Sequence, residues 1–275
     1  METLKNYLKH NTEYWDGHIH LFDHSGTIDL SLIDEKYKCV CFADIVFKQL
    51  NKYSDKKIIS YYDDFINKYY DESKHILLAT GITSDEIIEI YNKYPNIIKG
   101  FGELKCYSEF EDGKLPYADL KWIMPLLEFN KALKLPVYIH YELIDDKCYK
   151  NFEQLLKDYP EIPFILCHCG MVDNETNNDN IYEFIMLLMQ KYSNLYFDIS
   201  YTASKYLLNN TNRLIMMLNL YKNRIICGSD INPIIKVSRF VNNPKQYSNN
   251  RYSELKKLLK LVDNTTVIKK LFRIA

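Results

Sequence analysis

Tyr14-Trp15-Asp16-Gly17-His18-Ile19-His20-Leu21-Phe22 is the stretch of sequence that decides the fold. Its apolar residues predict a strand over residues 15–21. The competing architecture, a doubly wound open sheet, would need a glycine-rich phosphate turn after its first strand, and this stretch contains none. Side chains two apart on a strand point the same way, so His18 and His20 would project side by side. That spacing suits a shared divalent metal ion.

Short apolar segments alternate with longer amphipathic ones along the rest of the chain, which is typical of β/α units around a parallel sheet. The other predicted strands are 38–46, 76–82, 97–105, 136–140, 163–168, 194–199 and 224–229. The predicted helices are 84–94 with Ser84 as N-cap, 120–133, 149–159, 180–192, 204–221, 251–261 and 265–272. Eight strands with intervening helices predict an α/β fold, a (β/α)8 TIM barrel. We expect a single domain over residues 1–275, with residues 1–13 as an N-terminal extension.

The composition is that of an ordinary globular protein, with 47% hydrophobic and 26% charged residues. The balance of 35 basic against 36 acidic side chains argues against nucleic acid or an anionic membrane as partner. No apolar run approaches the roughly 20 residues that span a bilayer, and the first residues lack a signal-peptide core. Seven cysteines, an odd number, fit a reducing compartment. We therefore expect a cytoplasmic protein.

The remaining histidines concentrate the chemistry at strand ends. His140 ends the predicted fifth strand, His168 ends the sixth, and Asp230 follows the eighth. In a (β/α)8 barrel, functional groups lie at the carboxyl ends of the strands. Together with His18 and His20, these residues would meet at one rim, so the sequence predicts a metal site there.

This ordered set of residues resembles the metal-site residues of the amidohydrolase superfamily, and the local sequence motifs around them resemble those of its amidohydrolase-2 branch. The resemblance runs from about residue 14 to the C-terminus. It rests on five segments: Asp16-Gly17-His18-Ile19-His20, Leu135-Pro136-Val137-Tyr138-Ile139-His140, His168-Cys169-Gly170, Gly228-Ser229-Asp230-Ile231-Asn232-Pro233 and Val267-Ile268-Lys269-Lys270-Leu271-Phe272.

The resemblance implies a role for each matching position. His18, His20 and His140 would hold a catalytic divalent ion, most often zinc, with Asp230 completing the sphere. The metal lowers the pKa of its water toward about 7, so hydroxide forms at neutral pH. Asp230 would take the proton of the water and later deliver one to the leaving group. His168 would either bind a second metal or polarise the substrate carbonyl.

Glu103 decides how many metal ions are expected. Some superfamily members carry a bridging carboxylate or a modified lysine at the end of strand four, and they hold two metals. Lys105 shares the strand face of Glu103, and it could bridge only if it were carboxylated; a plain ion pair between the two residues is the alternative. We expect one essential ion, with Glu103 as a ligand or as support for one.

Other residues have weaker expectations. Asp198 ends the seventh strand, where it would either orient a ligand histidine or cap a helix. Tyr141 would line the substrate pocket or pack at the surface. Cys167 and Cys169 flank His168, so strand alternation would turn both toward the outer helices. His75 begins its strand and would lie at the opposite rim.

The favoured function is a metal-dependent hydrolase in which metal-bound hydroxide cleaves an amide, lactam or lactone-type C–N or C–O bond of a small molecule. Decarboxylation, which the same branch also performs, is a variant. One alternative is a TatD-like two-metal phosphodiesterase or deoxyribonuclease; another is a catalytically inactive metal-binding barrel. Such barrels often pair, which allows a homodimer. Residues 232–250 would form a lid over the pocket or a surface excursion.

Overall fold

The computed structural model describes residues 14–23, 33–44, 58–106, 120–171, 178–231 and 244–274. Within these residues, eight parallel strands follow one another in chain order in a single sheet. Their bounds are β1 (Tyr14–Asp23), β2 (Tyr37–Asp44), β3 (His75–Ala79), β4 (Ile98–Lys105), β5 (Val137–His140), β6 (Phe164–Leu166), β7 (Leu195–Ile199) and β8 (Ile225–Cys227). The predicted (β/α)8 barrel is confirmed.

Backbone contacts between β1 and the residues after β8 bring the two ends of the sheet together. Ile19 and Ile231 form a parallel bridge. The amide of Asp230 donates to the carbonyl of His18 at 2.9 Å, and the amide of His20 donates to the carbonyl of Ile231 at 2.9 Å. We call this junction the seam of the barrel.

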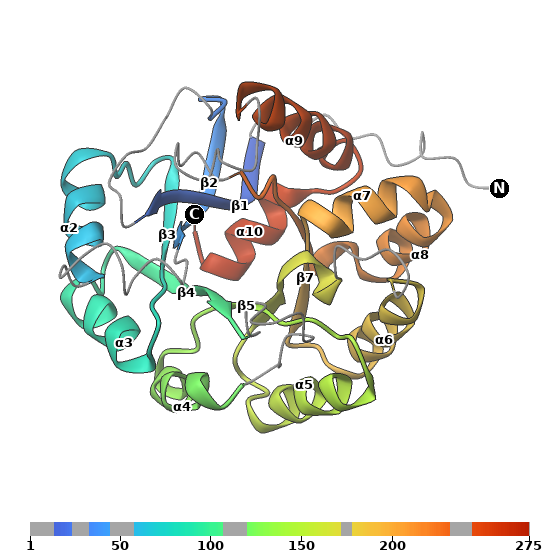
Figure 1. Cartoon of the computed structure of the whole chain (residues 1–275), viewed down its shortest axis with the longest axis horizontal. Coiled ribbons are helices and arrows are strands. Elements are labelled where there is room, and N and C mark those ends of the chain that lie inside the picture. Colours follow the sequence, from blue (N-terminus) through green and yellow to red (C-terminus); the bar gives the residue numbers. More distant parts are fainter. Residues whose placement is uncertain are drawn as a thin grey trace, which may run out of the picture.

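Helices surround the strands (Figure 1). Their bounds are α2 (Ile59–Lys68), α3 (Ser84–Lys93), α4 (Met124–Leu133), α5 (Asp146–Asp158), α6 (Asn178–Lys191), α7 (Tyr201–Asn209), α8 (Thr211–Tyr221), α9 (Pro244–Leu259) and α10 (Asn264–Phe272). Single 3-10 turns cover η3 (Lys121–Ile123), η4 (Cys167–Gly170) and η6 (Lys222–Arg224).

Three helical predictions need correction. Helix α2 had no counterpart among the predicted helices; its aromatic residues are poor intrinsic helix formers, and tertiary burial of its apolar face stabilises it. The predicted helix 204–221 is two helices, because Asn210 leaves helical geometry and its side-chain amide donates to the carbonyl of Tyr206. The N-cap of α3 is Thr83, which forms a capping box with Glu86. Ser84 instead donates to the carbonyl of Trp122 at 2.6 Å.

Two hydrophobic cores hold the layers together. The larger core lies between the strands and the outer helices. The smaller core fills the barrel interior with side chains such as Phe42, Leu78 and Tyr138, which pack against Val267 and Phe272 of α10. Helix α10 lies across the inside of the ring in Figure 1, and Asn264 at its start bonds to the backbone of Trp15 near the beginning of β1. The helix therefore covers the end where the strands begin, which leaves the other end for chemistry.

All seven cysteines lie in described residues, where they are buried and free of disulfides. None of the helices that the structure describes is long and apolar enough to span a membrane. Residues 1–13 and 232–243 lie outside the described residues. The N-terminal extension and the part of the predicted lid or surface excursion over 232–243 therefore stay predictions, whereas residues 244–250 of that segment begin helix α9.

Candidate metal centre

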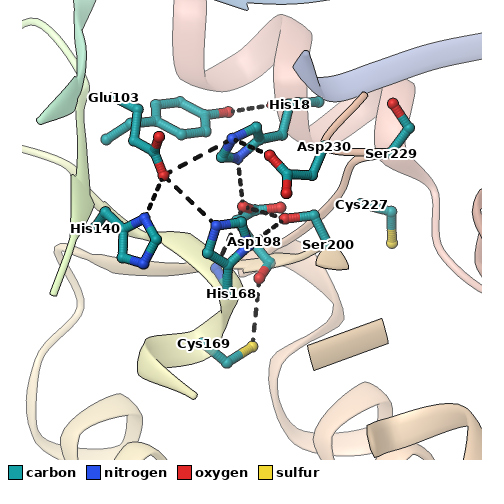
Figure 2. Close-up of polar contacts among 12 residues, drawn as sticks. His18, Glu103, His140, His168, Cys169, Asp198, Ser200, Cys227, Ser229 and Asp230 are labelled. Carbon is teal, nitrogen blue, oxygen red and sulfur yellow. Dashed lines mark hydrogen bonds and ion pairs between the residues drawn. The ribbon is translucent and has the colours of Figure 1, made fainter. Parts of the chain in front are cut away.

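Most of the side chains singled out in the sequence converge at the carboxyl ends of the strands, and Figure 2 shows those of His18, Glu103, His140, His168, Asp198 and Asp230. Each comes from a different part of the barrel: His18 and His20 from β1, Glu103 from β4, His140 from β5, His168 from the turn after β6, Asp198 from β7 and Asp230 after β8. These side chains, which are far apart in the sequence, thus meet in one small volume. They form four groups of potential metal ligands, and within each group the ligand atoms lie within 4.8 Å of one another.

Three potential metal ligands, two imidazole nitrogens and one carboxylate oxygen, face one another at the centre. The Nε2 atoms of His18 and His20 are 3.3 Å apart, and Oδ1 of Asp230 lies 3.2 Å from the first and 3.3 Å from the second. Nδ1 of His18 lies 2.7 Å from Asp198 Oδ2. Its ring proton is assigned there, which leaves a lone pair on Nε2. Ligands about 2.0–2.1 Å from a tetrahedral ion are about 3.3–3.4 Å apart, so the spacing and chemistry of these atoms fit a divalent cation.

Glu103 lies between these donors and two further histidines. Its Oε2 is 3.5 Å from Nε2 of His20, and its Oε1 is 2.8 Å from Nδ1 of His140 and 3.5 Å from Nε2 of His168. The sequence grouped His140 with His18 and His20. The structure instead places it beside Glu103 and His168. The carboxylate is thus positioned for either the bridging or the supporting role considered for it.

A turn that breaks the strand pattern presents His168. Strand β6 ends at Leu166, and both His168 and Cys169 adopt positive φ angles of 53° and 54°. Ser200 donates to Asp198 at 2.7 Å, so its oxygen is left to accept from Nδ1 of His168 at 2.9 Å. The other ring nitrogen, Nε2, therefore faces the centre, where it offers a lone pair when the ring is neutral and an N–H when it is protonated.

The charges of the cluster call for a cation. Burial alone would raise the pKa values of Glu103 and Asp230, but the surrounding imidazoles hold both well below their ordinary range. Burial alone would lower the pKa of His18, but Asp198 and Asp230 raise it well above its ordinary value. The ionised carboxylates favour positive charge at this place, and a divalent ion would supply it in place of the imidazole protons.

Two buried carboxylates hold the ligands in place. Asp198 Oδ2 faces Nδ1 of His18, the arrangement expected of a residue that orients a ligand histidine. Asp16 accepts from the amide of His18 at 3.2 Å and from the amide and hydroxyl of Ser229 at 2.8 and 2.5 Å. Asp16 thereby ties β1 to the loop that carries Asp230. Burial raises the pKa of Asp16 to about 6.

Glycines allow the backbones to approach at two points of the site. A Cβ at Gly228 would lie 2.4 Å from Cβ of His18, so only glycine lets the end of β8 pass beside that ligand. Gly102, which precedes Glu103, has a φ of 129°, and a Cβ there would lie 2.6 Å from Tyr138. Glycine is the residue that tolerates both constraints.

The structure corrects the predicted direction of one cysteine. Cys167 belongs to the inner core, and its sulfur groups with His18 and Asp198. Cys169 donates from Sγ to the carbonyl of Asp198 at 3.5 Å. Phe164 and Leu166 belong to the outer core while Ile165 and Cys167 belong to the inner one, so alternation holds as far as Cys167. It fails at His168, where the backbone turns with positive φ.

Tyr141 and Lys105 lie on different sides of the β4–β5 pair. Tyr141 is fully buried and stacks on Phe152 of α5 with a centroid distance of 5.5 Å. This packing gives no support to the predicted contact between Tyr141 and substrate. Lys105 pairs in register with His140. Burial lowers the pKa of His140, and the charges of His168 and Lys105 lower it further against the opposing effect of Glu103.

Sequence reasoning missed Ser200 and Ser229, although both hold site carboxylates. Each follows a strand end, but a serine there has many ordinary uses. Only its hydrogen-bond partner, which comes from elsewhere in the chain, shows its role.

Comparisons with known proteins agree with this geometry. A family model described as Amidohydrolase matches residues 100–255, more than half of the chain. No curated protein matches the chain.

Several solved structures share the fold. A probable 2-pyrone-4,6-dicarboxylic acid hydrolase from Acinetobacter baumannii, with citric acid bound, has 15% identity and a TM-score of 0.61 over 96% of this chain and 100% of its own. A dihydroorotase from Campylobacter jejuni has 16% identity and a TM-score of 0.55 over 96% of this chain and 84% of its own. A 2,6-dihydroxybenzoate decarboxylase from Rhizobium has 15% identity and a TM-score of 0.51 over 94% of this chain and 99% of its own.

At such low identity these structural likenesses establish the fold, whereas the family model establishes the relationship. The chain therefore belongs to the amidohydrolase family, whose members depend on a metal, and it is an amidohydrolase-type enzyme.

Proposed function

We propose that this enzyme hydrolyses an amide, lactam or lactone-type C–N or C–O bond of a small molecule, with zinc as its metal. The observation that carries the proposal is the convergence of Nε2 of His18, Nε2 of His20 and Oδ1 of Asp230 at 3.2–3.3 Å from one another. These three residues would hold the essential ion. Glu103 and His140 would complete or support the set from the adjoining group.

The residues around the ion have separate tasks. A divalent ion held there lowers the pKa of water and withdraws electron density from a carbonyl oxygen. Asp230, whose pKa lies well below its ordinary range, is ionised and can accept the proton of the attacking water. The same carboxyl can then return a proton to the leaving nitrogen or oxygen. Burial alone would lower the pKa of His168, but Asp230 and Glu103 raise it, so Nε2 can carry a proton and steady the developing negative charge on the carbonyl oxygen.

Decarboxylation of an aromatic or unsaturated acid uses the same donor set, and one structural neighbour is a decarboxylase. A two-metal phosphodiesterase is the alternative that the position of Glu103 permits, since its carboxylate faces two histidine groups. The near-zero net charge argues against an extended contact with nucleic acid. The number of ions per chain separates this alternative from the favoured one.

The test combines metal analysis with a substrate screen. Protein purified without added metal is expected to contain about one divalent ion per chain, in keeping with the donor set. Zinc-loaded and manganese-loaded enzyme is then screened against amides, lactams, lactones and aromatic carboxylates. Asp230→Asn should abolish turnover while the circular dichroism spectrum stays native, and Asp158→Asn, at an exposed position of α5, should leave turnover unchanged. Full activity of Asp230→Asn would refute the assigned mechanism.

A further inference from the structure

An arginine from α9 lies between two tyrosine rings near the centre. The guanidinium carbon of Arg251 is 4.3 Å from the ring centroid of Tyr201 and 5.1 Å from that of Tyr247. The Arg251 side chain is only 13% exposed. A cation packed over aromatic rings and largely shielded from water keeps more of its electrostatic reach than one on an open surface.

Both tyrosines connect this arginine to the metal centre. Tyr201, the first residue of α7, meets the ring of His168 edge-on with a centroid distance of 5.7 Å. The hydroxyl of Tyr247 donates to the carbonyl of Asp230 at 3.4 Å. Burial alone would lower the pKa of Arg251, but Tyr247 and Asp230 raise it above its ordinary value. The cation therefore lies beside the two residues assigned to acid–base chemistry and oxyanion stabilisation.

The ion pair between Arg251 and Glu254 is a loose one. Its Nη1 is 3.6 Å from Oε2 of Glu254, and that oxygen also accepts from the hydroxyl of Ser204 at 3.0 Å. Rings that pack over a guanidinium cover its faces, whereas its N–H groups lie along its edge. That edge matches the two oxygens of a carboxylate.

A second arginine provides an internal comparison. Arg213 of α8 also packs over two tyrosine rings, with centroid distances of 4.9 Å to Tyr182 and 5.7 Å to Tyr206. It forms a close ion pair with Asp179. Among the described residues, the hydroxyls of these tyrosines bond to Arg213 and Asp179 and not to the metal centre, so Arg213 joins outer helices. Arg251 differs in its loose carboxylate partner and in its links to His168 and Asp230.

We propose that Arg251 is a substrate-binding residue that recognises a carboxylate group carried by the substrate. This inference rests on the proposed function for the location of the reacting bond. It adds a chemical class: the substrate is an anionic acid whose carboxylate binds Arg251 while its scissile carbonyl faces Asp230 and His168.

The test measures binding of isophthalate, a small dicarboxylate, and of isophthalamide, its neutral counterpart, to the full chain by calorimetry. Isophthalate should bind wild-type protein, and Arg251→Gln should weaken that binding about tenfold or more, as for loss of a hydrogen-bonded charge pair. Arg251→Lys keeps the charge but loses the two-pronged geometry, so it should fold and still bind more weakly than wild type. Arg213→Gln, the matched control, should bind as wild type does. Any binding of isophthalamide should be insensitive to Arg251→Gln.

Each contrary result would overturn the proposal. One such result is equal isophthalate affinity in Arg251→Gln and wild type, and another is an equal loss of affinity in Arg251→Gln and Arg213→Gln. A third is the absence of saturable isophthalate binding to wild type up to about 10 mM, a concentration at which even one weak charge-assisted contact should be detected. The measurements are made on zinc-loaded and metal-free protein. Because the metal-free arm needs neither ion nor turnover, its result stands apart from failure of the proposed hydrolase activity.

Discussion

Asn264 is a buried side chain whose replacement should weaken the seam of the barrel. It is the first residue of α10 and is 1% exposed. Its Nδ2 donates to the carbonyls of Trp15 at 2.7 Å and Cys227 at 2.9 Å, and its Oδ1 accepts from the amide of Cys227 at 2.8 Å. One side chain thus joins α10 to both β1 and β8.

The magnitude follows from these three bonds. Asn264→Ala removes all of them and leaves buried backbone groups without their partners. Each bond contributes about 1 kcal/mol net, and an orphaned buried group costs about 1–3 kcal/mol. We therefore expect the free energy of unfolding to fall by about 3–5 kcal/mol. For a chain of this size the melting temperature should fall by roughly 6–15 °C.

Urea denaturation followed by circular dichroism measures the effect, provided that the slope of the transition is unchanged between variants. Asn264→Asp places a carboxylate oxygen against the carbonyls of Trp15 and Cys227 in a buried site, so at neutral pH it should destabilise the chain at least as much as Asn264→Ala. Asn92→Ala, at an exposed position of α3, should change the free energy of unfolding by less than about 0.5 kcal/mol. A loss below about 1 kcal/mol for Asn264→Ala would refute the reasoning, because one ordinary hydrogen bond would account for it.

Three further predictions concern the metal centre and the opposite rim. His18→Ala should lower the metal content measured by elemental analysis, because it removes one of the three converging donors; undiminished metal content would show that the ion binds elsewhere. Asp198→Asn should weaken metal affinity about 10- to 100-fold while the fold is kept, because the side chain orients His18 rather than closing the seam; unchanged affinity in a metal titration would remove that role. Burial lowers the pKa of His75, whose Nδ1 accepts from the amide of Asp71. The folded state therefore favours the neutral ring, and stability should fall as pH drops below the unfolded value of about 6.5. The difference in unfolding free energy between wild type and His75→Gln, measured across this range, should shrink as the pH falls; a constant difference would contradict this expectation.

The fold could be predicted because its signals are local. An apolar run that ends in a functional residue, such as Val137–His140, has the length of a strand, and the observed strand matches it. The spacing of His18 and His20 needs only strand alternation to bring the rings together. Once the strands are parallel and close into a barrel, their carboxyl ends meet at one rim. The positions of His140, His168 and Asp230 at that rim follow from the same rule.

The grouping within the rim could not be predicted because it depends on contacts between distant segments. His140 lies beside Glu103 through the β4–β5 register, which is irregular between Phe101 and Leu104. The positive φ at His168 breaks the strand alternation and turns that ring to the centre, so the direction of Cys167 could not be found by counting from His168. These features come from packing against other strands, and no local pattern of residue types encodes them.

The metal centre and the closure of the barrel depend on the same junction. His18 and His20 come from β1 and Asp230 follows β8, and the backbone bonds between these segments are the seam itself. An ion held by both segments would join the two ends of the sheet just above the hydrogen bonds of Asn264. An ion that binds only the folded chain adds stability that rises with the logarithm of its affinity. Metal affinity and barrel stability are therefore thermodynamically linked here. Weakening the seam at Asn264 should therefore disturb the positions of the three metal-ligand atoms of His18, His20 and Asp230. Among the described residues, losing one of these ligands should leave Asn264 and Asp16 as the main side chains that hold β1 against β8.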